Sequence, residues 1–158
     1  MTPHEIRFAA DGMLQSLATW LRLLGYDCVS RTDHDGRRLL EQAATEGRAF
    51  LTRNAHLADN LPHALLARGE IVYVVAERLP AQVREVVRRF ALDPETFAFT
   101  RCIACNVPLE STAIAPAGLP ADVAARETVF WQCPGCGKTF WRGSHVINSL
   151  ARMRDWLR

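Results

Sequence analysis

The sequence predicts an α/β fold: a three-layer α/β/α domain with a central parallel sheet, followed by a small cysteine-rich domain. Short apolar segments alternate with amphipathic segments from residue 6 to about Pro94, and alternation at this spacing is typical of a parallel sheet with helices on both faces. The remainder is richer in Cys, Pro, Gly and Trp and contains two Cys-x-x-Cys pairs. We therefore expect one domain over residues 1–96 and a second over residues 97–158.

The first strand is expected over residues 6–10, and it ends at Asp11. Gly25 ends the helix that follows, whose apolar side chains recur at the spacing of one helix face: Met13, Leu14, Leu17, Ala18, Leu21 and Leu24. Asp11 thus lies where a strand passes into a helix. In open α/β sheets that carboxyl edge is where ligand sites usually form.

Three more strand–helix units are expected along the first domain. A strand over residues 26–29 leads through a polar loop to a helix that Asp35 caps and Gly47 ends. The strand over residues 49–52 should be buried on both faces, and two short helices are expected near residues 55–60 and 62–67. The strand over residues 71–75 precedes a helix that begins at Pro80.

The second domain is expected to be a zinc ribbon with a C-terminal helix. Strands over residues 128–132 and 138–142 flank a Cys-x-x-Cys turn, which is the hairpin of such a ribbon, and residues 144–158 have helical periodicity. The predicted ligands of a structural Zn²⁺ ion are Cys102, Cys105, Cys133 and Cys136. Four thiolates fill a tetrahedral shell and leave no open position for catalysis. Two disulfides or an iron–sulfur cluster are the alternatives, while Cys28 is expected to be buried in a strand.

Composition limits the class of protein. Apolar residues make up 49% of the 158 residues, so a packed core is expected and global disorder is not. No apolar run is long enough to span a bilayer, and the first residues do not have the pattern of a signal peptide. We therefore expect a cytoplasmic protein without membrane association.

A zinc ion with four thiolates would cancel the formal charge of +2, so the total charge is no argument for nucleic acid. The sequence has no glycine-rich phosphate-binding loop, so we do not expect a nucleotide-dependent enzyme.

Acidic residues near the predicted sheet edge are candidate catalytic residues and ligands of Mg²⁺ or Mn²⁺. The candidates are Asp11, Asp33, Asp35 and Asp59, together with Asn54. Carboxylate oxygens are the ligands that these ions prefer, and such an ion activates water for phosphodiester hydrolysis. Helix capping by Asp11 and Asp35 and a solvated position for Asp59 explain the same residues, and spacing alone leaves both interpretations open.

Three arginines are candidates for contacts with the phosphates of a bound nucleic-acid strand: Arg22, Arg53 and Arg142. Arg22 and Arg53 are expected near the carboxyl edge of the sheet, where they could equally balance carboxylates. Arg142 belongs to a basic C-terminal segment with Trp131, Trp141 and Trp156 nearby in sequence. Stacking together with charge is how proteins hold single-stranded nucleic acid. The alternative is that the tryptophans pack the ribbon against its neighbours.

Nearly the whole chain resembles the Mut7-C RNase domain family, a PIN-like nuclease fold followed by a zinc ribbon. The matching segments are residues 11–27, Asp33 and Asp35 ahead of Leu39-Leu40, residues 51–54, 99–106, 130–138 and 141–145. The resemblance implies metal-dependent cleavage of RNA by an acidic cluster, with Asp11 as the first metal ligand and Asp35 or Asp33 as the second.

One position departs from the family pattern. The family usually has Leu-Thr-Arg-Asp where this chain has Leu-Thr-Arg-Asn, with Asn54 at the end. An amide offers a metal one oxygen but no charge, so weaker metal binding and lower activity are expected, which Asp59 could partly offset. Two other functions remain open: a non-catalytic RNA-binding module, and an adaptor that binds proteins through the zinc ribbon.

Overall fold

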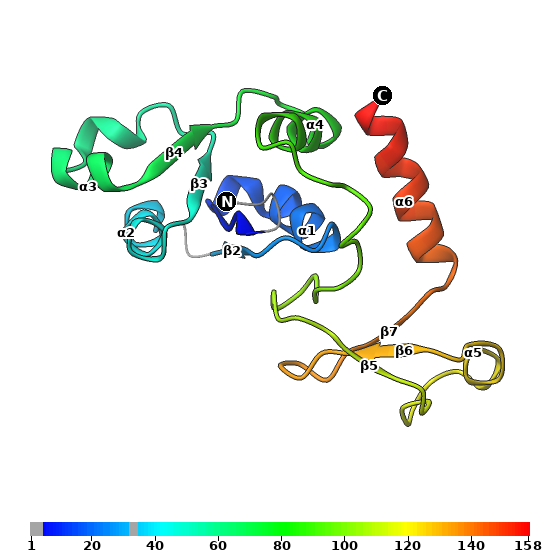
Figure 1. The fold of residues 1–158 in the computed structure, drawn as a ribbon. Helices are drawn as coiled ribbons and strands as arrows, with labels where there is room; N and C mark the ends of the chain where they lie inside the picture. The colour runs from blue at the N-terminus through cyan, green and yellow to red at the C-terminus, as the bar shows by residue number, and fades with distance from the viewer. Residues whose placement is uncertain (1–4, 32–34) are drawn as a thin grey trace.

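The computed structural model describes residues 5–31 and 35–158. Within this part of the chain, four parallel strands form a sheet in the order β2-β1-β3-β4. They are β1 (Phe8–Ala10), β2 (Cys28–Ser30), β3 (Ala49–Thr52) and β4 (Glu70–Tyr73). The predicted α/β class and parallel sheet are confirmed (Figure 1).

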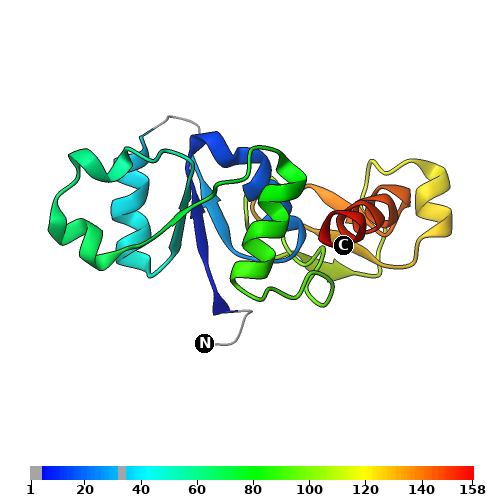
Figure 2. The same ribbon diagram turned by 90° about the horizontal axis from the view of Figure 1, so that it is seen from above.

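Helices cover both faces of this sheet, which gives the predicted three layers (Figure 2). The helices α1 (Gln15–Leu23) and α4 (Leu79–Arg89) pack on one face, and α2 (Gly36–Glu46) packs on the other. Successive side chains of a strand point to opposite faces. Accordingly Phe8 and Leu51 join the core under α1 and α4, whereas Ala9 and Phe50 pack against α2.

The helix ends follow the predicted capping residues. Asp11 caps a 3-10 turn, Gly12–Leu14, that precedes α1, and Asp35 caps α2 through a hydrogen bond of 3.0 Å from the Arg38 N–H. Gly47 ends α2 in the left-handed conformation. The predicted pair of short helices is a 3-10 turn, Leu57–Asn60, and α3 (His63–Arg68).

The strand β4 ends earlier than predicted. Val75 is 80% exposed, and the N–H groups of Val75 and Ala76 donate to the Glu85 carboxylate instead of continuing the sheet. The apolar run therefore predicted a strand that is too long at its end. The backbone N–H groups there bind the Glu85 side chain of α4 and not a neighbouring strand.

The described residues of the second part contain a three-stranded antiparallel sheet in the order β5-β6-β7. Its strands are β5 (Glu110–Thr112), β6 (Phe130–Gln132) and β7 (Thr139–Trp141), with α5 (Ala121–Arg126) between β5 and β6. The hairpin of β6 and β7 was predicted. Neither the strand β5 nor the helix α5 was predicted from the sequence.

The last helix, α6 (Ser144–Leu157), returns to the first part of the chain and packs against α4. Figure 1 shows the two helices side by side. Met153 is buried in the core cluster that lies under α1 and α4, and the rings of Trp20 and Trp156 lie 4.4 Å apart. The Arg84 Nε–H also donates to the Trp156 carbonyl at 2.6 Å. Among the described helices none has the length and apolarity of a membrane span.

Gly25, which follows α1, lies so close to the Phe97 backbone that no side chain fits there. Its φ is +90°, and an added Cβ would lie 2.0 Å from the Phe97 carbonyl oxygen. We expect Gly25→Ala to lower the free energy of unfolding by about 3 kcal/mol or more, because the clash is with backbone. Chemical denaturation measures this loss. The matched control is Gly47→Ala, where φ is +64° but nothing lies within 4 Å, so a loss of only about 1 kcal/mol is expected. Equal losses in the two variants would show that the close approach is unimportant.

Candidate functional site

A shallow pocket of about 230 Å³ lies at the carboxyl edge of the sheet. Its walls come from the ends of β1 and β3 and from the start of α2: Asp11, Gly12, Met13, Gly36, Arg37, Asn54 and Leu57. The structure thus brings together two of the predicted site residues, Asp11 and Asn54, which are far apart in the sequence. This is the edge at which the sequence predicted a site.

Asp11 is only 7% exposed. One carboxylate oxygen accepts the Met13 N–H at 2.9 Å, and the other accepts the hydroxyl of Thr52. Among the described residues no cation forms an ion pair with this carboxylate. Burial of a carboxylate without a counter-charge is costly, so the position suits a bound cation.

Thr52 connects Asp11 to Asn54. Its buried hydroxyl donates to Asp11 and accepts the Asn54 N–H at 3.0 Å. The Asn54 side-chain oxygen accepts the His56 N–H at 3.1 Å, while the residue as a whole is exposed. Sequence reasoning assigned no role to Thr52, although its place at the end of a buried strand and two residues before Asn54 is a usable signal.

Asp35 and Asp59, the other predicted acidic residues that the structure describes, are not among the residues that line this pocket. Asp35 caps α2. Asp59 is exposed and pairs with His56 at 2.9 Å. Asp33 lies outside the described residues. Within residues 5–31 and 35–158, the four cysteines are the one group of three or more side chains of metal-ligating type that lie together.

Arg37 is a pocket residue that sequence reasoning missed. It lines the pocket beside Asp11, and its Nε–H donates to Glu41 at 3.1 Å in an exposed pair. Exposed pairs of this kind contribute little stability, so the guanidinium is available to an anion. Its position in the first turn of a helix after Asp35 was the signal in the sequence.

The sulfur atoms of Cys102, Cys105, Cys133 and Cys136 all lie within 4.8 Å of one another. Sulfurs around a tetrahedral ion with metal–sulfur bonds of about 2.3 Å are about 3.8 Å apart. Cys102 and Cys136 lie at 3.8 Å, and Cys105 and Cys133 at 3.1 Å. The predicted cluster is therefore present, and it can hold a metal ion such as zinc.

The two Cys-x-x-Cys turns have the same backbone geometry. In each, the N–H of the residue after the second cysteine donates to the carbonyl of the first, from Asn106 at 2.9 Å and from Gly137 at 2.8 Å. Both of these residues have positive φ, +66° and +71°. Two turns of one shape that face each other are what a four-thiolate shell requires.

The first of these turns is bound to the strand β2. Asn106 accepts the Cys28 N–H at 3.0 Å and donates to Asp27 at 2.7 Å. Although burial raises the pKa of the Asp27 carboxyl, hydrogen bonds from Arg48 and Asn106 outweigh it and lower that pKa overall. Cys28 itself is buried as predicted, and burial raises the pKa of its thiol to about 12.

Arg22, a residue of α1, also connects the first cysteine turn to β2. It is 8% exposed, and its guanidinium donates to the carbonyls of Cys28, Ile103 and Ala104 and to the Ser30 hydroxyl, at 2.7 to 3.1 Å. Since all these donors are used within the protein, we do not include Arg22 in an RNA-binding surface.

The other two arginine candidates are more accessible. Arg53 follows β3 at the carboxyl edge and donates weakly to the Glu77 carbonyl at 3.4 Å. Arg142 is exposed, after β7, and lines a second pocket between the ribbon and α6. These two arginines therefore remain candidates for phosphate contacts.

The family model described as the Mut7-C RNAse domain matches residues 6–153, a range that includes both the pocket at the sheet edge and the four cysteines. No curated protein and no solved structure gave a significant match.

Proposed function

Because the chain belongs to the Mut7-C RNAse domain family, we propose that it is a metal-dependent ribonuclease that hydrolyses phosphodiester bonds of single-stranded RNA. The observation that carries this proposal beyond the family is Asp11, a buried carboxylate at the carboxyl edge of the sheet without an ion-pair partner among the described residues. A pocket there is open enough to admit a phosphate.

The donor set of the pocket fits a hard divalent cation. Asp11 supplies a carboxylate and Asn54 an amide oxygen, and both are oxygen ligands of the kind that Mg²⁺ and Mn²⁺ bind. Asp35 and Asp33 are the further ligands that we propose from the family pattern. Such an ion, when bound, activates water and stabilises the charge that develops on a phosphate.

The protein residues around Asp11 have separate roles in this proposal. Thr52 fixes the orientation of the carboxylate through its hydroxyl. Arg37, in the wall of the pocket, is placed to neutralise a phosphate. Arg53 at the same edge is a second candidate for that contact.

We propose that the ion in the cysteine cluster is Zn²⁺ and that its role is structural. A shell of four thiolates leaves no position for substrate or water. The described ribbon buries few apolar side chains, with Phe130 the one large example, so metal ligation is needed to hold it.

Restoring a carboxylate at Asn54 tests the nuclease proposal. We expect Asn54→Asp to lower the Mn²⁺ concentration for half-maximal RNA cleavage by about tenfold or more, because a full negative charge returns to the ligand set. The assay follows cleavage of labelled single-stranded RNA across a Mn²⁺ titration. Asn148→Asp, an exposed change of the same kind on α6, is the matched control.

The other two functions make different predictions in the same assay. Tight RNA binding without cleavage by either the natural chain or Asn54→Asp would identify a non-catalytic RNA-binding module. A protein partner together with no measurable RNA affinity would identify an adaptor. Either result would overturn the ribonuclease proposal.

A further inference from the structure

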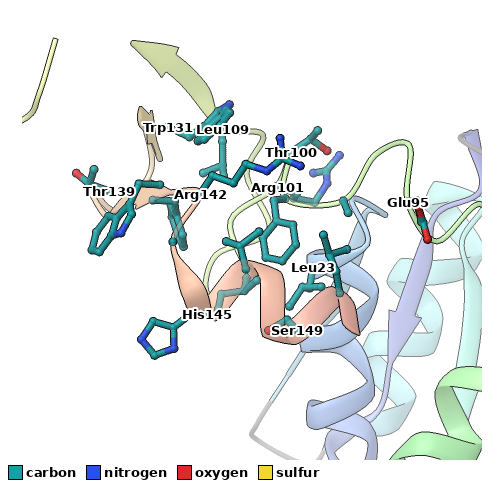
Figure 3. A pocket seen from close by; sticks show the side chains of 18 residues that line it. Leu23, Glu95, Thr100, Arg101, Leu109, Trp131, Thr139, Arg142, His145 and Ser149 are labelled. Carbon is teal, nitrogen blue, oxygen red and sulfur yellow. The ribbon is translucent and has the colours of Figure 1, made fainter. Parts of the chain in front are cut away.

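A second and larger pocket, of about 480 Å³, lies between the zinc ribbon, the segment after α4 and the helix α6. Figure 3 shows side chains from all three parts around it. Trp131 and Leu109 from the ribbon lie on the opposite side of this space from Ser149 of α6 and Leu23 of α1. Its volume lies within the range of small-molecule sites, about 300 to 1,000 Å³.

Four of the side chains that line this pocket are aromatic. They are Phe99, Trp131, Phe140 and Trp141. None of the four is fully buried, so their rings are not simply part of a closed core. Flat aromatic surfaces in an open pocket suit a planar ligand, which can stack on them.

Gly143 allows one of these rings to lie against the backbone. An added Cβ at Gly143 would be 2.8 Å from Nε1 and 3.1 Å from Cδ1 of Trp141. The indole therefore occupies space that a side chain at position 143 would take.

The unpaired charge in the pocket wall is positive. Glu95 is neutralised by Arg154, with nitrogen–oxygen distances of 2.7 and 3.1 Å. Arg101 donates to the carbonyls of Gly25 and Asn106. Arg142, by contrast, is exposed and forms no ion pair or hydrogen bond with another described residue. An anion next to a planar group would match this arrangement.

We propose that this pocket binds an unpaired base of single-stranded RNA, with Arg142 on the adjacent phosphate. The proposal rests on the ribonuclease function above, because it takes RNA as the ligand. Aromatic rings accept the face of any base, and a guanidinium binds phosphate through two hydrogen bonds. An apolar side chain of a peptide could stack on the aromatic rings, but it would leave Arg142 without an anionic partner. The positive charge of Arg142 therefore favours RNA over an apolar peptide as the ligand.

The test measures binding of a fluorescein-labelled 12-nucleotide RNA to the full zinc-loaded chain by anisotropy, with Asp11→Asn present to prevent cleavage. We expect Arg142→Gln to weaken binding by about tenfold and to reduce the slope of log K against log salt by about 0.7, the value for one phosphate contact on a single strand. Arg152→Gln, an exposed change on α6 outside the pocket, should change neither quantity.

Stacking has a separate readout in tryptophan fluorescence. Trp131 and Trp141 line the pocket, whereas Trp20 and Trp156 pack against each other. RNA should quench the emission of the first pair, and Trp131→Leu should reduce both the quenching and the affinity, the latter by about tenfold or more. Gly143→Ala should weaken binding through displacement of the Trp141 ring.

Equal RNA affinity in Arg142→Gln, Arg152→Gln and Trp131→Leu would overturn the pocket proposal, and a protein segment would then be the better occupant. Cleavage of RNA by the natural chain would still support the ribonuclease function in that case. Conversely, RNA binding that depends on Arg142 and Trp131 in a chain that cleaves no RNA would support the pocket proposal and overturn the ribonuclease proposal.

Discussion

Replacing Asp11 with asparagine is expected to reduce RNA cleavage by at least about a thousandfold. The change removes the one buried carboxylate of the pocket and with it the charge that we propose holds the divalent ion. Outer-shell changes at metal sites already cost 10- to 100-fold, so loss of a direct ligand should cost more.

The fold should tolerate this change. Asparagine keeps an oxygen for the Met13 N–H, and the Thr52 hydroxyl can rotate to accept from the new amide. The measurement is single-turnover cleavage of labelled RNA with Mn²⁺, with the melting temperature recorded beside it. Glu70→Gln, at the exposed opposite end of β4, is the control and should cleave at the natural rate. Full activity in Asp11→Asn would contradict the assignment of this pocket as the active site.

Replacing Cys133 with serine is expected to unfold the zinc ribbon while the four-stranded parallel sheet remains. Cys133 is fully buried, and structural zinc sites contribute apparent binding free energies of about 10–16 kcal/mol. The few apolar side chains that the ribbon buries cannot compensate for a loss of this size. Amide signals of β5, β6 and β7 should collapse in the NMR spectrum, and bound zinc should fall by one equivalent.

Cys28→Ala provides the matched control for this experiment. Cys28 is also buried, but it lies in β2 and outside the four-sulfur cluster. It should keep its zinc and its ribbon signals and lose only the stability of a small cavity. A Cys133→Ser protein with full zinc content and an intact ribbon would show that the cluster does not hold the metal.

The first domain was predictable because its signals are local. Apolar periodicity and the capping residues Asp35 and Gly47 lie within the elements that they define. The strand β5 and the docking of α6 were not predictable in the same way. A three-residue strand depends on its partner β6, and the position of α6 depends on contacts such as that between Trp20 and Trp156.

The candidate site was predictable in part for the same reason. The four cysteines are recognisable from their spacing, and their cluster is confirmed. Sequence position allowed Asp35 to be a metal ligand or a helix cap, and it allowed Arg22 to contact phosphate or to balance carboxylates. Arg22 donates to carbonyls more than 80 residues away, and no local pattern contains such partners. The predicted roles of Asp11, Asp33, Asp35, Asn54 and Asp59 in catalysis stay predictions.

The hydrogen bonds that fasten the first cysteine turn to β2 also stop the parallel sheet from growing. β2 is the outermost strand on its side, and its Cys28 N–H and carbonyl are taken by side chains of Asn106 and Arg22. An outermost strand with free backbone groups invites pairing with another chain. If the four thiolates bind an ion as we propose, its loss would free the Asn106 side chain and leave the Cys28 N–H of this outer strand without its partner. We therefore expect the metal-free molecule to self-associate more readily through β2.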